Sequence, residues 1–391
     1  MLHRKQSLFA DDLKNHESEI AVALYEKSVC VIGGAGSIGS AFIKEVLRHG
    51  WIRSLVVIDI SENGLAELTR DLRSSNTYRL PEDYRPYALD YADPIFARMF
   101  REEGGFDVVA NFSAHKHVRS ENDRYSVQAL LENNDLKARQ LMELLSEYPP
   151  EHFFCVSTDK AANPVNVMGA SKRIMEDLVM AYSDRFKVTT ARFANVAFSN
   201  GSLPDSWLRR LARRQPLAAP ADVKRYFVSM EEAGQICLMA CMLGKSGEIF
   251  FPKLKESQML RFHEICSDFL AAQGLERVEC ANDFEARVYA EKMEPGSRKY
   301  PVIYFNSNTT GEKAFEEFYE EGEPLDLERY ASLGVIRHGK RRSLEEVEAF
   351  FGRLEKLFAG DFTKAEVVEC MRTFIPNFAH EELNLNLNDG M

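Results

Sequence analysis

The sequence predicts an α/β protein built on a doubly wound parallel sheet, with a smaller C-terminal substrate lobe interleaved with the main domain. Two observations support this prediction. Short apolar runs recur through roughly the first half of the chain, each followed by a longer helical pattern, as in parallel strands joined by helices. A glycine-rich loop, residues 33–39, lies between the first apolar run and the first helical pattern, where doubly wound sheets bind their ligands.

The apolar runs and the patterns between them define the expected elements in order. Strands are expected at residues 28–32, 54–59, 107–112, 152–157 and 188–193, and helices at 41–47, 127–145 and 172–182. The chain then divides into an N-terminal helical extension (1–27), a sheet domain (28–200), a substrate lobe interleaved with it (201–330) and a C-terminal helical segment (331–391). A length of 391 residues is sufficient for two such units.

The composition narrows the class of function. The net charge of −11 argues against binding to nucleic acid, which requires a basic surface. No apolar run approaches the roughly 20 residues that cross a bilayer, so no membrane span is expected. The seven cysteines form no CxxC pair, and Cys237 and Cys241 lie in an apolar helical run, which favours core packing over a metal site. An odd number of thiols without a signal peptide favours the cytoplasm.

The glycine-rich loop has the spacing expected of a dinucleotide site. Gly33, Gly36 and Gly39 give the pattern GxxGxxG, and Ser37 and Ile38, which lie between them in the loop, are further candidate contacts to the cofactor. Glycine at these positions permits a sharp turn, close approach of the backbone to a pyrophosphate, and tight packing of helix on strand. The pyrophosphate would lie at the helix N-terminus, where free N–H groups favour an anion. The loop therefore predicts a bound nicotinamide dinucleotide on a Rossmann domain.

Acidic residues after the next strands bear on which dinucleotide is bound. Asp59 lies 20 residues after Gly39, and its carboxylate would accept hydrogen bonds from the adenosine ribose, which favours NAD over NADP. Arg70 and Arg73 lie further along and would suit a 2′-phosphate, so NADP is the alternative. Asp90 is a candidate adenine contact and equally a candidate helix N-cap.

A dense group of polar side chains follows the expected strand at 152–157. Thr158, Asp159 and Lys160 place a hydroxyl, a carboxyl and an ammonium side by side, and Lys172 opens the next helix. A polar turn with a helix cap would also explain them. Their position at the carboxyl end of a strand favours a chemical site.

At these residues the chain resembles a known family, the extended short-chain dehydrogenases/reductases, and within it the nucleotide-sugar 4,6-dehydratases of bacterial polysaccharide synthesis. The matching pieces are the Gly33 loop and residues 114–118, 157–172, 192–196, 224–227 and 310–313. Together they span roughly residues 28–320. The segments STDKA, MGASK and TGEK are typical of the branch that acts on UDP-N-acetylglucosamine and close relatives.

Three residues depart from the family pattern. Met168 stands four residues before Lys172, where the family usually has Tyr. Methionine cannot transfer a proton, so the usual Tyr–Lys couple is absent. Some members that retain the configuration at the sugar's C5 also have Met there. Ala194 and Asn200 stand where Gly and Arg are common.

The resemblance implies a reaction in three steps on a tightly held, recycled NAD. The sugar is oxidised at C4, water is eliminated across C5 and C6, and the hydride returns to C6. Lys160 is the expected base at C5, with a pKa lowered by burial or nearby cations, and Asp159 is the expected acid at C6. Lys172 is the candidate acceptor of the C4 hydroxyl proton and a contact of the nicotinamide ribose, with Thr158 positioning the hydroxyl. A water beside Met168 is the alternative acceptor.

The remaining candidate residues are contacts to the ligands. Ala114 is expected beside the cofactor. The candidate contacts to the substrate are Lys116, His117, Asn195, Ser202, Arg225 and Glu312. Arg225 suits a diphosphate, whereas His117 could equally be a packed core histidine and Glu312 part of a surface ion pair.

Two other functions remain open. A nucleotide-sugar C4 epimerase on the same fold would need oxidation at C4 but no acid and base at C5 and C6, so the Asp159–Lys160 pair argues against it. A catalytically silent NAD-binding regulator is suggested by Met168, and Asp159 and Lys172 argue against it. The expected partner is a nucleotide sugar, and the resemblance implies a homo-oligomer.

Overall fold

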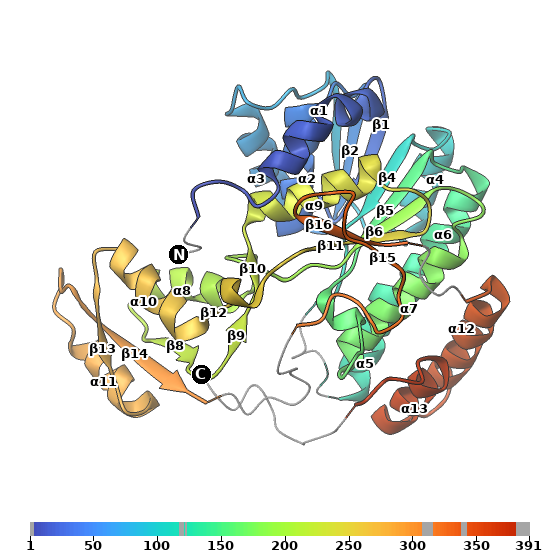
Figure 1. Cartoon of the computed structure of the whole chain (residues 1–391). Helices are drawn as coiled ribbons and strands as arrows, with labels where there is room; N and C mark the ends of the chain where they lie inside the picture. Colours follow the sequence, from blue (N-terminus) through green and yellow to red (C-terminus); the bar gives the residue numbers. More distant parts are fainter. Residues whose placement is uncertain (1–3, 117–120, 122, 307–315, 338–341, 381–391) are drawn as a thin grey trace.

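The computed structural model describes residues 4–116, 121, 123–306, 316–337 and 342–380. A sheet of nine strands forms its centre (Figure 1). In spatial order the strands are β15 (Leu325–Asp326), β16 (Leu333–Ile336), β11 (Glu248–Pro252), β6 (Val188–Ala191), β5 (His152–Val156), β4 (Val108–Asn111), β1 (Ser28–Ile32), β2 (Ser54–Asp59) and β3 (Asp83–Ala88). The seven strands from β11 to β3 are parallel, β16 runs antiparallel to β11, and β15 pairs antiparallel with β16.

Helices cover both faces of this sheet. Helices α1 (Ala10–Leu24), α2 (Ser37–His49) and α9 (Met230–Leu243) pack together, and α5 (Arg124–Leu131), α6 (Lys137–Glu147), α7 (Val167–Ala181) and α12 (Leu344–Phe358) form a second group. Strand β1 contributes to two apolar cores, with Val29 and Val31 in one and Cys30 and Ile32 in the other. Because side chains alternate across a strand, both faces of β1 are buried in apolar cores. This burial explains its unbroken apolar run.

The predicted fold class is confirmed: the strand order β3-β2-β1-β4-β5-β6 is that of a Rossmann domain. The sequence pattern missed β3, because its residues Asp83–Ala88 are all exposed or half-buried and form no apolar run. Its Pro86 is tolerated because β3 is an edge strand. The segment 331–391, expected to be helical, begins instead with β16. This strand pairs with β11 in the main sheet, where its four residues are all buried.

The smaller lobe is built on three parallel strands in the order β13-β14-β8 (Figure 1, lower left). These are β8 (Leu217–Pro220), β13 (Glu276–Glu279) and β14 (Lys299–Phe305), and they are accompanied by α8 (Leu203–Ala212), α10 (Phe262–Ala272) and α11 (Asp283–Lys292). Trp207 and Phe269 lie at its core. The chain enters this lobe after β6, returns to the main sheet at β11, and crosses back for α10, so the two units are interleaved.

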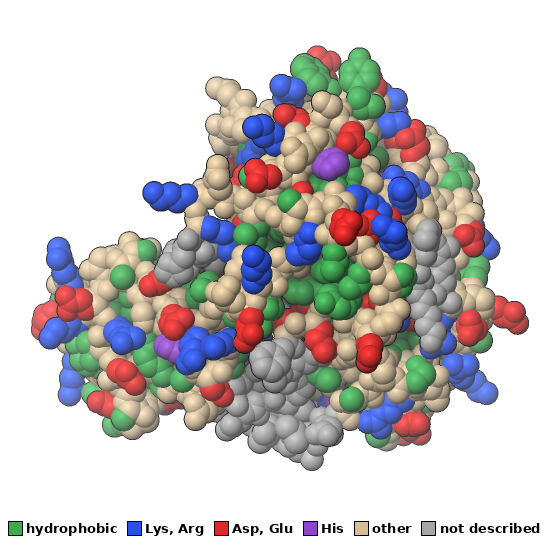
Figure 2. All heavy atoms as spheres, viewed as in Figure 1, with side chains coloured by type: hydrophobic (Ala, Val, Ile, Leu, Met, Phe, Trp, Pro, Cys, Tyr) green, Lys and Arg blue, Asp and Glu red, His purple; other side chains and the backbone are tan. Residues whose placement is uncertain are grey.

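The surface carries charges of both signs. In Figure 2, basic and acidic side chains are interspersed over the visible face rather than gathered into one basic area. Helix α13 (Lys364–Phe374) pairs with α12 at the outer side of α7. Within the described part of the chain, no helix is long and apolar enough to cross a membrane.

A buried ion pair joins the central strands to α7. Arg192, directly after β6, is fully buried and donates two hydrogen bonds to Glu176 of α7, at 2.9 and 2.8 Å. It also donates to the carbonyl oxygen of Phe318 at 3.0 Å and to Glu323 at 3.2 Å. The hydroxyl of Ser157, after β5, donates to the same Glu176 carboxylate at 2.5 Å. The ends of β5 and β6, helix α7 and the segment after residue 316 therefore meet at one ion pair.

We expect Arg192→Ala to destabilise the fold by about 3–5 kcal/mol, because it leaves the buried Glu176 carboxylate without its counter-charge. Urea unfolding followed by circular dichroism measures this change. Arg101→Ala is the matched control, since Arg101 makes a similar two-bonded pair with Glu147 on the surface and should change the unfolding midpoint very little. Equal midpoints for the Arg192 variant and the wild type would contradict the expectation.

Candidate functional site

The glycine-rich loop is packed too tightly for side chains at Gly33 and Gly39. Gly33 has a φ of +72°, and a Cβ there would lie 2.7 Å from the backbone nitrogen of Ser113. A Cβ on Gly39 would lie 2.3 Å from the carbonyl oxygen of Gly33. The loop therefore lies directly against the end of β4 and against the first turn of α2, as a dinucleotide-binding turn requires.

Helix α2 begins at this loop without a side-chain cap. Gly36 is its N-cap residue and provides no capping hydrogen bond, so the first N–H groups are available to an anion. Ile38 is half-buried in the next turn. The hydroxyl of Ser37 accepts a hydrogen bond from the backbone N–H of Asn200 at 2.8 Å. Asn200, where the family often has Arg, thus contacts the loop through its backbone.

Asp59 ends β2 beside the loop, as its position in the sequence predicted. Its carboxylate accepts hydrogen bonds from the backbone N–H of Ala35 at 3.0 Å and of Ser61 at 2.9 Å. Each oxygen retains acceptor capacity for a ribose hydroxyl. Ala114 lies after β4, on the other side of β1, where the strand order reverses and such sheets bind their ligands.

Asp90 is not the helix N-cap that the sequence offered as an alternative. The N-cap of α4 (Pro94–Glu102) is Asp93, whose side chain accepts from the backbone N–H of Ile95. Asp90 instead accepts from the backbone N–H of Ala92 at 3.0 Å and pairs with Lys137. Its role as an adenine contact stays a prediction.

The predicted acid and base lie in a short 3₁₀ turn, Asp159–Ala161, at the carboxyl end of β5. The hydroxyl of Thr158 donates to the Asp159 carboxylate at 2.6 Å, and the ammonium of Lys160 donates to both Asp159 oxygens at 3.1 and 3.2 Å. Asp159 is buried, whereas Lys160 is about 30% exposed. The turn is held against α7, because a Cβ on Gly169 would lie 2.4 Å from the carbonyl oxygen of Lys160.

The expected lowering of the Lys160 pKa is wrong for the free protein. Desolvation acts in that direction, but the carboxylates of Asp159 and Glu316 more than offset it and raise the pKa of Lys160 above its ordinary value. The nearby cation, Arg225, has a smaller opposing effect. Lys160 is therefore an ammonium in an ion pair, and it becomes a base only if a bound ligand changes this balance.

The sequence analysis missed Glu316, a third carboxyl at this site. It accepts a hydrogen bond from the backbone N–H of Tyr226 at 2.7 Å and another from the side chain of Asn195, and it lies 3.9 Å from Arg225. Burial and then the charge of Asp159 raise the pKa of Glu316 to about 8. Glu316 follows the TGEK segment by only three residues, and that proximity was the available signal.

Helix α7 carries the other two predicted catalytic residues. Met168, in its first turn, is buried in the apolar core and donates its backbone N–H to Glu121 at 2.8 Å. Lys172 is 4% exposed, and the hydrogen-bond partner of its ammonium is the sulfur of Met175, at 3.3 Å. Burial lowers the pKa of Lys172, so this lysine, rather than Lys160, is the one with a tendency to be a neutral amine.

The structure brings together only some of the residues predicted to contact the substrate. Asn195, in β7 (Asn195–Val196), and Arg225, in β9 (Lys224–Arg225), both lie near Glu316. Ser202 is the N-cap of α8 and accepts from the backbone N–H of Asp205 at 3.3 Å, so its hydroxyl has a structural role. Lys116 is exposed. His117 and Glu312 lie outside the described residues.

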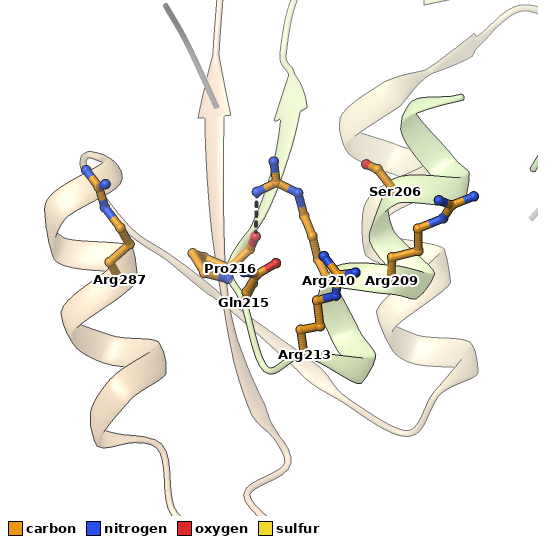
Figure 3. Close-up of a pocket in the computed structure, with 7 residues that line it drawn as sticks. All are labelled: Ser206, Arg209, Arg210, Arg213, Gln215, Pro216 and Arg287. Carbon is orange, nitrogen blue, oxygen red and sulfur yellow. Dashed lines mark hydrogen bonds between the residues drawn. The ribbon is translucent and has the colours of Figure 1, made fainter. Parts of the chain in front are cut away.

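A separate hollow of about 420 Å³ lies on the smaller lobe between α8 and α11 (Figure 3). Its lining includes Arg209, Arg210, Arg213 and Arg287, and Arg210 donates to the carbonyl oxygen of Pro216 at 3.2 Å. It contains none of the predicted site residues. No group of three metal-binding side chains occurs within the ranges that the structure covers.

Comparison with known proteins identifies the family. The model of a family described as polysaccharide biosynthesis protein matches residues 29–332. The chain belongs to this family. An uncharacterized membrane protein of Methanocaldococcus jannaschii is 30% identical over 80% of this chain and 86% of its own length. The capsular polysaccharide biosynthesis protein CapD of Staphylococcus aureus is 25% identical over 77% of this chain, which spans about half, 49%, of CapD.

Two classes of enzyme are named among the relatives, a dehydratase and an epimerase. A UDP-N-acetylglucosamine 4,6-dehydratase (inverting) of Campylobacter jejuni is 26% identical over 58% of this chain and 67% of that enzyme. A UDP-glucose 4-epimerase of Rickettsia conorii is 24% identical over 88% and 98%. The X-ray structure of Pen from Bacillus thuringiensis shares the fold, with a TM-score of 0.64 at 20% identity over 82% and 91% of the two chains. The resemblance to extended short-chain dehydrogenases/reductases is confirmed.

We expect Glu316→Gln to flatten the pH dependence of stability between about pH 4.5 and about pH 8. In that window an unfolded Glu316 is ionised while the folded one holds its proton, so wild-type stability falls with rising pH by up to about 1.4 kcal/mol per unit. Urea midpoints across this range measure the effect. The exposed Glu321 provides the control variant Glu321→Gln, and a constant difference between the Glu316 variant and wild type at every pH would refute the raised pKa.

Proposed function

We propose that this protein catalyses the NAD-dependent 4,6-dehydration of a nucleotide-activated N-acetylhexosamine, UDP-N-acetylglucosamine first among them, to a 4-keto-6-deoxy sugar for surface glycan synthesis. The observation that carries the proposal is the Asp159–Lys160 ion pair at the carboxyl end of β5, beside Glu316. An acid and a base side by side suit elimination across adjacent carbons. The dehydratase named among the relatives supports the same reaction class.

The residues around the glycine-rich loop fit a nicotinamide dinucleotide. Gly33, Gly36 and Gly39 leave room for a pyrophosphate at the N-terminus of α2. Asp59 would accept from the adenosine ribose, and Lys172 would donate to the nicotinamide ribose. When bound, the dinucleotide would take up a hydride from the sugar and later return it.

Lys172 is the acceptor of the C4 hydroxyl proton in this proposal. Oxidation at C4 requires an acceptor for the hydroxyl proton, and Met168 cannot provide one. Lys172 has a lowered pKa, as an amine base requires. Thr158, whose hydroxyl already donates to Asp159, would hold the substrate hydroxyl in place.

The elimination then uses the Asp159–Lys160 pair as one unit. A sugar that displaces water from the pair would disfavour both charges. Transfer of one proton across the 3.1 Å from Lys160 to Asp159 converts ammonium and carboxylate into amine and acid. The amine is the base for the C5 proton, and the acid protonates the departing C6 hydroxyl. Arg225 and Asn195, released from Glu316, would hold the diphosphate or the sugar.

The competing function is a nucleotide-sugar C4 epimerase, a class that is also named among the relatives. An epimerase needs the proton acceptor at C4 but has no use for an acid and a base at C5 and C6. The buried Asp159 in contact with Lys160 therefore favours the dehydratase. Glu316, a further proton-holding group nearby, adds to this preference.

We expect the purified protein, given NAD and UDP-N-acetylglucosamine, to form a product lighter by one water that retains the configuration at C5. Retention follows because inversion needs a second proton donor on the opposite face, and Met168 cannot donate. Mass spectrometry detects the loss of water, and proton NMR couplings at C5 of the fresh product report the configuration.

The matched control for this assay is Gly39→Val, which would close the loop and abolish turnover and cofactor retention. A product of unchanged mass epimerised at C4 would establish the epimerase instead. Turnover with NADP but not with NAD would contradict the inference from Asp59, and an inverted C5 would contradict the inference from Met168.

We expect Lys160→Ala to lose dehydration while retaining slow oxidation at C4, because the two steps use different side chains. Removal of a general base typically lowers the rate by about 10²–10⁴-fold. A single-turnover experiment that follows nicotinamide absorbance would show reduction without the return of the hydride. Dehydration near the wild-type rate would show that Lys160 is not the base.

A further inference from the structure

The hollow between α8 and α11 concentrates positive charge in an otherwise acidic protein. It adjoins a second hollow, also of about 420 Å³, with which it shares Gln215, Pro216 and Arg287. The chain as a whole has a net charge of −11, so a group of guanidinium groups here runs against the overall charge and requires an explanation. The charged side chains that line the two hollows are five arginines and one glutamate: Arg209, Arg210, Arg213, Arg214, Arg287 and Glu291.

The end of a helix explains only some of these arginines. Arg209, Arg210 and Arg213 lie at the C-terminal end of α8, where the helix dipole favours cations. Arg209 and Arg213 are nevertheless four residues apart, so they are neighbours on the helix surface and their like charges repel. Arg287 belongs to the middle of α11 and lines the same hollow from its other side (Figure 3). The dipole of α8 does not account for a cation from that second helix.

Carboxylates neutralise this group only in part. Arg209 pairs with Asp205 at 2.9 Å, and Arg287 donates to the carbonyl oxygen of Asp283 at 3.2 Å. Among the described residues, neither Arg213 nor Arg287 forms an ion pair with a carboxylate. Guanidinium groups stay charged in proteins. At least two positive charges therefore line the hollow without a carboxylate beside them.

The turn after α8 is held in place by contacts with the rest of the lobe. Arg214 has a φ of +56°, the left-handed conformation that favours glycine at the end of a helix. Its guanidinium donates to the carbonyl oxygen of Met293, directly after α11. The hydroxyl of Tyr300 donates to the carbonyl oxygen of Gln215 at 2.9 Å. Strained residues of this kind cluster at ligand sites, and a turn fixed in advance lowers the cost of binding.

We propose that the two hollows, which together we call the arginine site, bind an oligophosphate such as the di- or triphosphate group of a nucleotide. The fork-shaped guanidinium binds phosphate oxygens through two parallel hydrogen bonds. Guanidinium groups on two helices and a turn suit an anion with several charged groups in a row, whereas one carboxylate needs only one arginine. Pro216, Ala290 and Met293 give the second hollow an apolar side, against which the rest of such a ligand would lie.

The arginine site is separate from the site proposed for catalysis. Helix α8 has ten residues, so its two ends lie about 15 Å apart. Its N-cap, Ser202, is two residues from Asn200, whose backbone N–H donates to Ser37 in the glycine-rich loop. The arginines lie at the opposite end. The inference goes beyond the proposed function and does not depend on it, because it uses neither the reaction nor its residues.

The first test is calorimetric titration of the whole protein with inorganic tripolyphosphate, which carries the proposed charged group without a base or a sugar. We expect the double variant Arg213→Ala/Arg287→Ala to bind at least about tenfold more weakly, because it loses charge-assisted hydrogen bonds. The matched control is Arg98→Ala/Arg298→Ala, which removes the same charge elsewhere on the surface. All four arginines are exposed, and distant exposed charges are largely screened by salt, so the control should bind within about twofold of wild type.

Chemical protection locates the bound anion. Phenylglyoxal reacts with exposed guanidinium groups, and peptide mass mapping identifies the arginines that have reacted. Tripolyphosphate should protect Arg213 and Arg287 while Arg98 and Arg298 stay reactive. Equal reactivity of Arg213 and Arg287 with and without the anion would overturn the proposal. An Arg213→Ala/Arg287→Ala variant that binds tripolyphosphate as tightly as wild type would overturn it as well.

A membrane is another source of clustered phosphate groups, and sedimentation with phosphatidylglycerol vesicles distinguishes it. Wild-type protein that binds tripolyphosphate and stays in the supernatant supports a soluble ligand. Wild-type protein that sediments with the vesicles and binds no tripolyphosphate would overturn the proposal in favour of a lipid surface. None of these measurements uses turnover, so a protein inactive on nucleotide sugars would refute the proposed function and leave this test intact.

Discussion

The ion pair between Arg192 and Glu176 is the constraint on which the site depends. Both side chains are buried, and neither could be charged there without the other. The Glu176 carboxylate also receives the hydroxyl of Ser157, so the end of β5 is tied to α7 immediately before the turn that carries Asp159 and Lys160. Arg192 extends the connection to the segment that carries Glu316. One interaction thereby aligns three separate stretches of chain around a single edge of the sheet.

Two carboxyl groups and two basic side chains lie together at this edge, and the carboxyl of Glu316 holds its proton near neutral pH because its pKa is raised to about 8. Asp159 and Glu316 face Lys160 and Arg225, so the cluster has two acids and two bases. Such a group can move one proton internally without changing its total charge. Under the proposed function, that property would let Lys160, an ammonium in the free protein, become a base when a ligand excludes water.

The parts of this protein that could be predicted from sequence are those set by local pattern. The glycine spacing, Asp59 after the next strand, and the polar run at Thr158–Lys160 each follow from a few neighbouring residues. Strand β3 was missed because an edge strand has no unbroken apolar run. Glu316 joins the site through tertiary contacts with Asn195 and Tyr226, which no local pattern encodes. The pKa of Lys160 depends on the same contacts, and its predicted direction was therefore wrong.

Met168 stands where the family usually has a tyrosine, one turn of α7 before Lys172. A tyrosine beside a lysine divides the work, because the phenol carries the proton and the ammonium stabilises the phenolate. With methionine in that position, the proposed function assigns the proton to the lysine itself. Lys172 is suited to that role by a buried environment that lowers its pKa, since an amine must be neutral to accept a proton.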